Sequence, residues 1–427
     1  MSDRIFRGAL AALLFAGVLT ACSEKVTGSL GCPALCVDAS AALRDTILTS
    51  AVVLDSTFIG FPRQGETRDF TLLSLGDTAD VRLGVHYDTL KTRYQITGAS
   101  SDSLIRKVDS ATMIFLIDTT VVKPIRPFTI DAFDIDTSAT DTLTATIAPL
   151  YRANRLIGSR TYAATDVATD TVRLTLDNAA LFAKIKDTLR LRIGLQVRGT
   201  ATGSGARLRV LGTTFPPRIR YRVSSDTTVK PDTIFPSSIS PPKDLYQQAA
   251  FRFFPVVVKG RLPAPPIGRF IVGGIAGARA YLRFDIPPAV LDSVTVIRAS
   301  LLLTQLPARS TASTKDSVSV YTQPVIASPS ITDIFTASTF IGPPGLYGVD
   351  SVRFAPRDSG LRSIELVNLL RTWRLAGTTN ATRAVVLRSP EEGSLPGELD
   401  FVSTEGPAAL RPRLRITYVP RRGFGIP

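Results

Sequence analysis

Few residues in this sequence have the types and spacing that chemistry requires. Two cysteines, Cys32 and Cys36, stand four positions apart in Cys-Pro-Ala-Leu-Cys, and the chain has one histidine, His86. A zinc site would need further ligands, and the only histidine lies far from the cysteines along the chain. In an oxidising compartment, two cysteines so close in sequence favour a disulfide bond that closes a small loop. We therefore expect a disulfide between Cys32 and Cys36.

Catalysis finds little support in these residue types. A Ser-His-Asp or Cys-His arrangement would have to use His86, which lies in the strand-like segment Gly84-Val-His-Tyr-Asp88 without a nucleophile elbow. We expect His86 to be a structural or surface residue and the protein not to be an enzyme. A pair of carboxylates of the glycosidase kind stays open as an alternative, because the spacing of acidic side chains in space is not readable from the sequence.

Three aspartates stand close together in Ile130-Asp-Ala-Phe-Asp-Ile-Asp136. Asp131, Asp134 and Asp136 offer the oxygen ligands that calcium prefers, but their spacing fits no defined calcium loop. A solvated strand edge or turn explains them better. We expect no cofactor, with a structural calcium ion as the weaker alternative.

The beginning of the chain resembles the signal of a bacterial lipoprotein. Arg4 and Arg7 precede an apolar run that ends in Leu19-Thr20-Ala21-Cys22. The run is too short to span a membrane, for which about 20 residues are needed, so it is typical of a cleaved signal. The resemblance implies a signal peptide at 1–21, acyl chains on Cys22 and a membrane anchor without a spanning helix. Ser23 then favours the outer membrane, on the periplasmic or surface side of the cell envelope.

Composition indicates packed domains with a basic surface. The chain is 44% hydrophobic and 20% charged, which argues against disorder. Residues 245–427 contain 21 basic and 12 acidic side chains, whereas residues 23–244 contain 27 and 23. Such a surface favours anionic partners, of which acidic polysaccharide fits an exported protein and nucleic acid does not. Solubility alone is the other explanation for the charge.

Composition also divides the chain. Residues 22–40 form a polar tether, and 224–244 are rich in proline, serine and threonine, which suits a linker. The predicted domains are therefore 41–223 and 245–420, with 421–427 as a tail.

The dominant period of the sequence is two. Segments such as Thr171-Val-Arg-Leu-Thr-Leu176 and Arg218-Ile-Arg-Tyr-Arg-Val223 alternate apolar and polar residues, as half-buried strands do. Helical spacing is sparse and limited to 178–184 and 364–373. We predict an all-β fold with two tandem antiparallel β-sandwich domains of jelly-roll type.

The two halves also resemble each other. Matching segments occur in the same order at an offset of about 190 to 195 residues, for example Phe215-Pro-Pro-Arg-Ile-Arg-Tyr221 and Leu410-Arg-Pro-Arg-Leu-Arg-Ile416. We interpret this order as a tandem duplication.

The second half resembles the DNRLRE domain, a bacterial β-sandwich module. The resemblance rests on Arg279-Ala-Tyr-Leu-Arg-Phe-Asp-Ile-Pro287, on Ile364-Glu-Leu-Val-Asn-Leu-Leu-Arg-Thr-Trp373 and on Arg411-Pro-Arg-Leu-Arg-Ile-Thr-Tyr418. No literal DNRLRE string occurs, and the first half is similar only through the internal repeat. Some members of this family are classed as carbohydrate-binding modules for acidic polysaccharides, so the resemblance implies a sandwich and suggests such a ligand.

Sugar binding would need exposed aromatic rings beside cations. The candidates in the basic half are Tyr246, Phe251, Phe253, Phe254, Tyr321, Tyr347 and Trp373, with Arg252, Arg371 and Arg374 near them. Trp373 has helical spacing from three leucines, so we expect it in the core. The sequence thus predicts a lipid-anchored envelope protein with non-catalytic modules that bind acidic polysaccharide or mediate attachment. A purely structural or assembly lipoprotein, and a polysaccharide-degrading enzyme, are the alternatives.

Overall fold

The computed structural model describes most of the chain after residue 42. The described residues are 43–59, 69–75, 79–88, 90–96, 102–120, 122–137, 144–167, 170–187, 189–200, 205–212, 215–226, 228–237, 253–259, 265–309, 317–325, 337, 351–375 and 383–420. Among them, no helix has the length and apolar character needed to cross a bilayer.

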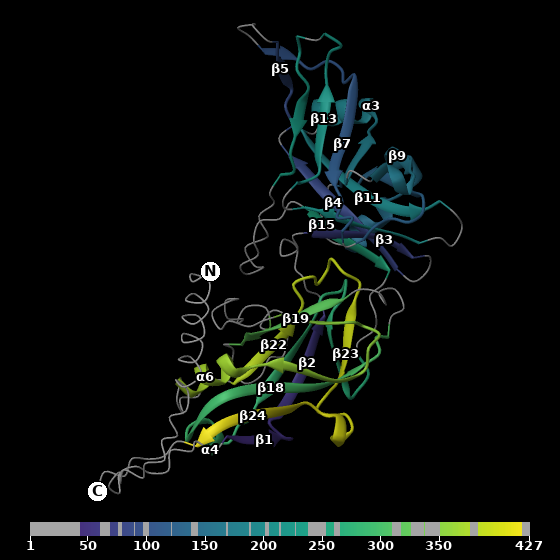
Figure 1. Ribbon diagram of the computed structural model, residues 1–427. Coiled ribbons are helices and arrows are strands. Elements are labelled where there is room, and N and C mark those ends of the chain that lie inside the picture. The colour runs from purple at the N-terminus through teal and green to yellow at the C-terminus, as the bar shows by residue number, and fades with distance from the viewer. Residues whose placement is uncertain are drawn as a thin grey trace, which may run out of the picture. The chain divides into compact units, whose positions relative to one another are not determined.

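The protein is all-β, as the alternating sequence predicts, and its sheets are antiparallel (Figure 1). We call the strands that pair in the first half the first lobe. One of its sheets has the order β12-β3-β4-β11-β8-β9, with β15 on β4, and the other has the order β10-β7-β13-β14. The bounds are β3 (Asp69–Leu75), β4 (Ala79–Asp88), β7 (Ser110–Leu116), β8 (Phe128–Asp134), β9 (Leu156–Tyr162), β10 (Thr171–Thr175), β11 (Arg190–Gly199), β12 (Ala206–Leu211), β13 (Arg218–Arg222), β14 (Asp232–Ile234) and β15 (Phe253–Lys259). A small hairpin, β5 (Arg93–Gln95) with β6 (Asp102–Leu104), accompanies them.

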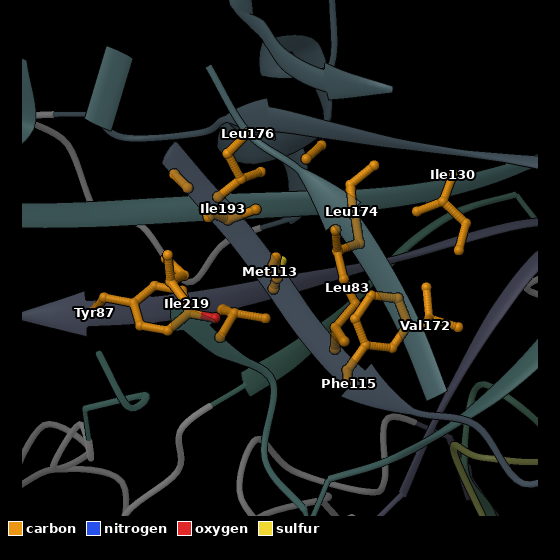
Figure 2. Packing of buried hydrophobic residues seen from close by; sticks show 14 of the residues in the cluster. Leu83, Tyr87, Met113, Phe115, Ile130, Val172, Leu174, Leu176, Ile193 and Ile219 are labelled. Atoms are coloured by element: carbon orange, nitrogen blue, oxygen red, sulfur yellow. The ribbon is translucent and has the colours of Figure 1, made fainter. Parts of the chain in front are cut away.

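The core of the first lobe lies between its two sheets. Leu83 and Ile193 from one sheet meet Met113, Leu174 and Ile219 from the other, and all of these side chains are fully buried (Figure 2). Each comes from a strand whose alternate residues face the other way, so the period of two in the sequence places one apolar face of each sheet inward.

The second lobe has the strand order β1-β24-β18-β23-β16-β17-β22-β19-β20, with β2 on β17 and β21 on β18. The bounds are β1 (Arg44–Leu48), β2 (Val52–Ile59), β16 (Arg269–Gly273), β17 (Ala278–Phe284), β18 (Val294–Leu306), β19 (Val318–Pro324), β20 (Val352–Phe354), β21 (Gly360–Glu365), β22 (Ala384–Arg388), β23 (Glu398–Val402) and β24 (Arg413–Pro420). Its core includes Phe270, Leu301, Leu387 and Phe401, all fully buried.

Both expected helices are present. The first, α3 (Asn178–Asp187), begins after Asp177, whose carboxylate accepts hydrogen bonds from the amides of Ala179 and Ala180 at 2.8 and 3.2 Å. The second, α6 (Val367–Leu375), begins three residues later than predicted. The reason is that Ile364 belongs to strand β21, where it pairs with Leu301 of β18. Short helical turns complete the described chain: α2 (Thr144–Ile147), α4 (Pro288–Leu291), η1 (Ala148–Leu150), η2 (Ala153–Arg155), η3 (Ala164–Val167) and η4 (Ala408–Leu410).

Strand pairing does not follow the predicted domain bounds of 41–223 and 245–420. The purple strands β1 and β2 lie among the green and yellow strands of the second lobe, where they pair with β24 and β17 (Figure 1). Strands β14 and β15 belong to the first lobe, where they pair with β13 and β4. The second lobe is therefore discontinuous in sequence. Alternation could not show this, because it fixes which face of a strand is buried but not which strand lies beside it.

We expect Leu83→Ala to destabilise the first lobe by about 2 to 5 kcal/mol, because it leaves a cavity between two closely packed sheets. The midpoint of urea unfolding should fall accordingly. The matched control is Leu104→Ala, since Leu104 is 53% exposed and its truncation should change the midpoint little. Equal shifts for the two variants would contradict the burial of Leu83.

Candidate functional site

The outer face of the sheet β10-β7-β13-β14 carries a row of arginines. Arg173 lies opposite Ile114, which lies opposite Arg218 on the next strand, so these three residues form one row across the sheet. Arg220 and Arg222 follow at alternate positions of β13. We call Arg173, Arg218, Arg220 and Arg222 the arginine face.

Alternation along the strands places these side chains outward. Val172 and Leu174 on either side of Arg173 are fully buried, as is Ile219 between Arg218 and Arg220. Positions two residues apart on a strand lie about 7 Å from each other, so β13 presents its guanidinium groups at a regular spacing. Ile114 is buried within this row even though it faces outward, which the aliphatic stems of neighbouring arginines explain.

The arginine face differs from other arginines of the first lobe in its electrostatics. Arg82, Arg192 and Arg209 form ion pairs with aspartates at 2.6, 2.7 and 3.0 Å. Among the described residues, the four members of the arginine face form no ion pair. Arg218 instead lies over the ring of Phe215, 3.9 Å from its centroid. The face therefore has positive charge available for an anion from outside the lobe.

A shallow pocket of about 250 Å³ lies on this face. Its lining residues are Ser110, Thr112, Ile114, Arg173, Arg220, Tyr221, Arg222 and Pro231. Hydroxyl groups beside guanidinium groups are suited to bind carboxylate or sulfate oxygens, because both are hydrogen-bond donors and arginine can donate two parallel bonds. Burial raises the pKa of Tyr221, so its hydroxyl group stays protonated. The arrangement can bind an acidic group, and the residues that line the pocket include no histidine or carboxylate.

The aromatic residues expected at a sugar site are mostly elsewhere. Trp373 is 6% exposed and packs against Phe284 with ring centroids 5.4 Å apart, which confirms its expected core position. Phe254 is buried in the first lobe, and Tyr321 is partly exposed near Arg388. The guanidinium group of Arg371 donates to the carbonyl oxygen of Val296, and Arg374 is partly buried on α6. Outside the description lie Tyr246, Phe251, Arg252, Tyr347 and the side chain of Phe253.

His86 has a structural position, as its sequence context suggests. It is fully buried in β4 and meets the ring of Phe254 edge to face, with centroids 5.1 Å apart. Its burial leaves no route for a substrate to its imidazole ring. The three cysteines Cys22, Cys32 and Cys36 lie outside the described residues, so the lipidation site and the disulfide remain predictions.

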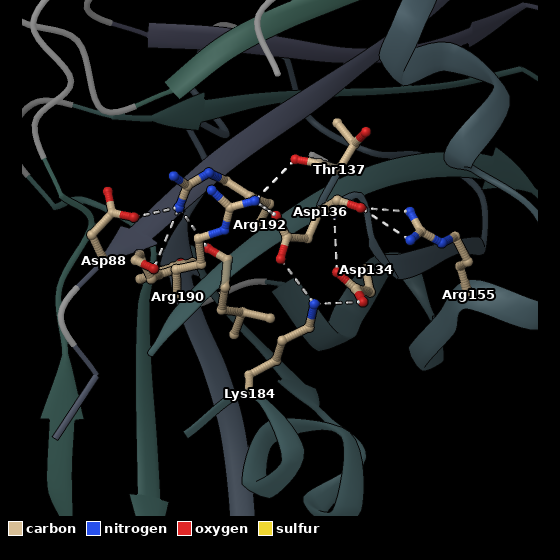
Figure 3. A network of polar contacts seen from close by, with 10 residues as sticks. Asp88, Asp134, Asp136, Thr137, Arg155, Lys184, Arg190 and Arg192 are labelled. Carbon is tan, nitrogen blue, oxygen red and sulfur yellow. Dashed lines mark hydrogen bonds and ion pairs between the residues drawn. The ribbon is translucent and has the colours of Figure 1, made fainter. Parts of the chain in front are cut away.

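Basic side chains contact all three aspartates of the calcium hypothesis, and Figure 3 shows the contacts of Asp134 and Asp136. Lys184 contacts both Asp134 and Asp136, at 3.0 and 3.1 Å. Asp131 points elsewhere, since Arg198 donates to it at 2.5 Å. Although burial opposes the shift, the hydrogen bond and charge of Lys184 lower the pKa of Asp136. The expected solvated edge is wrong for Asp131 and Asp136, which are 4% and 9% exposed.

The described part of the chain contains no group of side chains that could form a metal site. No cluster of three or more histidine, cysteine or acidic side chains occurs there. The ion pairs of the aspartate network instead tie β8 and β11 to helix α3. That network is a structural element of the first lobe.

A buried acidic pair in the second lobe was not found from the sequence. Glu398 and Asp400 are alternate residues of β23, 5% and 1% exposed, and Arg309 lies 3.7 and 3.8 Å from them. Burial raises the pKa of Glu398 to about 7, and Arg309 opposes this shift. The only signal in the sequence is two acidic residues that alternate with Leu399 and Phe401, which normally indicates an exposed strand face.

Comparison with known proteins does not assign this chain to a family. No family model and no curated protein matches the sequence. Among solved structures, the infectious bursal disease virus VP2 subviral particle is 11% identical with a TM-score of 0.14, covering 88% of this chain and 76% of that one. A structure titled BspA_C_mut is 8% identical with a TM-score of 0.10, covering 89% and 83%. Similarity this low indicates neither a shared fold nor a shared function.

Glu398 should make stability depend on pH. Its pKa is about 7 in the folded protein against an ordinary value of 4.5, so the folded state binds the proton more tightly. Stability should therefore fall as the pH rises from 4.5 to 7, by up to about 3 kcal/mol. Glu398→Gln should flatten this slope in urea unfolding measured across that range.

The matched control for this slope is Asp187→Asn, because Asp187 is an exposed acidic residue at the end of α3. This variant should keep the slope. An unchanged slope in Glu398→Gln would show that Glu398 is not the group responsible.

Proposed function

We propose that this protein is a lipid-anchored, non-catalytic component of the cell envelope that binds acidic polysaccharide through the arginine face. The observation that carries the proposal is a set of four arginines on one sheet face that form no ion pair among the described residues. Surface arginines that serve solubility have no need to gather on one face without an ion-pair partner among the described residues. A regular array of cations suits a polymer with regularly repeated acidic groups.

The sequence at Cys22 supports the anchor. A signal of this kind ends at a cysteine that receives acyl chains, and the outer membrane remains the proposed location. Strand β1 begins 22 residues after Cys22 and pairs with β24 in the second lobe. The tether therefore leads into the second lobe, and the arginine face lies on the other lobe.

A structural or assembly role is the competing proposal, in which the lobes are platforms for protein partners. A degrading enzyme has less support. Glu398 has a pKa near that of a general acid, but both Glu398 and Asp400 are covered. A glycosidase needs its carboxylates open to the sugar chain.

Affinity electrophoresis of the soluble protein that begins at Ser40 tests the ligand. Migration should be retarded by an acidic polysaccharide but not by a neutral one, and high salt should abolish the effect, because the Debye length falls from about 10 Å at 0.1 M to about 3 Å at 1 M. The triple variant Arg173→Ser, Arg220→Ser, Arg222→Ser should bind more weakly, on the order of tenfold or more.

The matched control for that variant removes the same charge from the second lobe. It is Arg44→Ser, Arg298→Ser, Arg415→Ser, in which Arg298 and Arg415 are exposed and already paired with acidic residues. This control should keep most of the retardation. Equal weakening in both triple variants would reduce the effect to net charge, and retention by none of the polysaccharides would favour the structural role.

The anchor has its own test. Cys22→Ser should remove the acyl chains, so the protein should move from the membrane fraction to the soluble fraction of the cells that make it, and mass spectrometry of the purified protein should show no lipid. Cys32→Ser should leave the membrane association unchanged. A Cys22→Ser protein that stays in the membrane fraction would contradict lipid anchoring at this residue.

A further inference from the structure

The two lobes have the same pattern of strand pairing. Apart from the β5·β6 hairpin, each strand pair of the first lobe has a counterpart in the second, formed by strands in the same chain order. The corresponding pairs are β3·β4 with β16·β17, β3·β12 with β16·β23, β4·β11 with β17·β22, β11·β8 with β22·β19, β8·β9 with β19·β20, β10·β7 with β21·β18, and β13·β7 with β24·β18. Helix α3 follows β10 in one lobe, and α6 follows β21 in the other.

In each lobe, two further strands do not follow this common chain order: β1 and β2 in the second lobe, and β14 and β15 in the first. In the second lobe, β24 pairs with β1 and β17 pairs with β2. In the first lobe, the corresponding strands β13 and β4 pair with β14 and β15. Strands β1 and β2 precede the first lobe in sequence, whereas β14 and β15 precede the rest of the second. Each half of the sequence therefore begins with two strands that lie in the other lobe.

The registers of the exchanged strands agree. Arg82 of β4 lies opposite Val256 of β15, and Arg279 of β17 lies opposite Phe58 of β2. The two arginines are 197 residues apart and their partners 198 residues apart. With Arg82 and Arg279 set at equivalent positions, the added strand therefore has the same register in both lobes to within one residue.

Packing at the two exchanged strands is also equivalent. The next paired positions are Gly84 with Phe254 and Tyr281 with Ser56. The Phe254 ring lies where a Cβ on Gly84 would be, so a larger residue at this position would displace the ring. In the second lobe the ring belongs to Tyr281, and it meets Phe58 edge to face at 5.5 Å. In both lobes, therefore, a ring of the donated strand, Phe254 or Phe58, meets a ring of the accepting strand, His86 or Tyr281, edge to face.

We infer that the chain consists of two copies of one sandwich that have exchanged their first two strands, so that each half is the binding partner of the other. The exchange satisfies backbone groups of β4, β13, β17 and β24 that would otherwise be open sheet edges.

Side chains fix the donated segments in place. Arg415 of β24 pairs with Asp45 of β1 at 2.5 Å, and the amide of Thr404 donates to Asp55 of β2 at 2.6 Å. In the first lobe, the amide of Asp88 donates to the hydroxyl oxygen of Ser237, which follows β14, at 2.5 Å. These bonds join residues more than 140 positions apart, so they select the exchanged arrangement over local pairing.

The test uses the soluble protein that begins at Ser40, which keeps the compact unit Leu43–Pro427 and contains no cysteine. A protease site inserted after Ser240 separates β14 from β15 in sequence. Cysteines are then placed at Leu54 and Arg283, which lie opposite each other in β2 and β17. After oxidation and cleavage, a non-reducing denaturing gel should show the two fragments joined as one band.

A second pair guards against a variant that fails to fold. Ile47→Cys with Arg415→Cys joins β1 to β24 at positions that are both exposed, and it should also give one band. The control is Thr129→Cys with Thr161→Cys, whose side chains are 2.9 Å apart within the first lobe. It should lose its thiols on oxidation and still give two bands. Two bands for both exchanged pairs, with the control disulfide formed, would overturn the exchange.

Discussion

Backbone hydrogen bonds at sheet edges are the constraint on which this structure depends. An antiparallel sandwich buries side chains readily, but each edge strand leaves a row of amide and carbonyl groups without partners. In this chain β4 and β17 each accept a strand from the opposite half of the sequence. The hydrophobic cores of the two lobes form separately. The second-lobe sheets, however, include β1 and β2, which precede the first lobe in sequence, and the first-lobe sheets include β14 and β15, which lie between β13 and β16.

The presence or absence of an acidic partner likewise distinguishes structural arginines from those available to a ligand. Arg279 is 1% exposed and lies 2.5 Å from Glu392, so its charge is neutralised inside the second lobe. Arg298 and Arg415 are exposed but also have acidic partners. The second half has the larger net charge, but the face without acidic partners among the described residues lies in the first lobe. Net charge per half is therefore a poor guide to where an anion binds.

Part of this structure could be predicted from the sequence. Alternation in Arg218-Ile-Arg-Tyr-Arg-Val223 correctly gives a strand with arginines on one face, and Asp177 before an apolar repeat marks the start of α3. The partner of β2 could not be predicted, because a period of two is the same whichever edge a strand joins. The burial of Glu398 was missed for a similar reason: alternate polar residues imply solvent only if nothing covers that face.

Native-state hydrogen exchange tests the central claim most directly. If β2 and β15 are integral strands, their hydrogen-bonded amides should exchange with the same opening free energy as those of β17 and β4, because each pair must open together. The account predicts matched protection within each pair across a range of low denaturant concentrations. Rapid exchange in β2 and β15 while β17 and β4 stay protected would contradict it, since the lobes would then be complete without the exchanged strands.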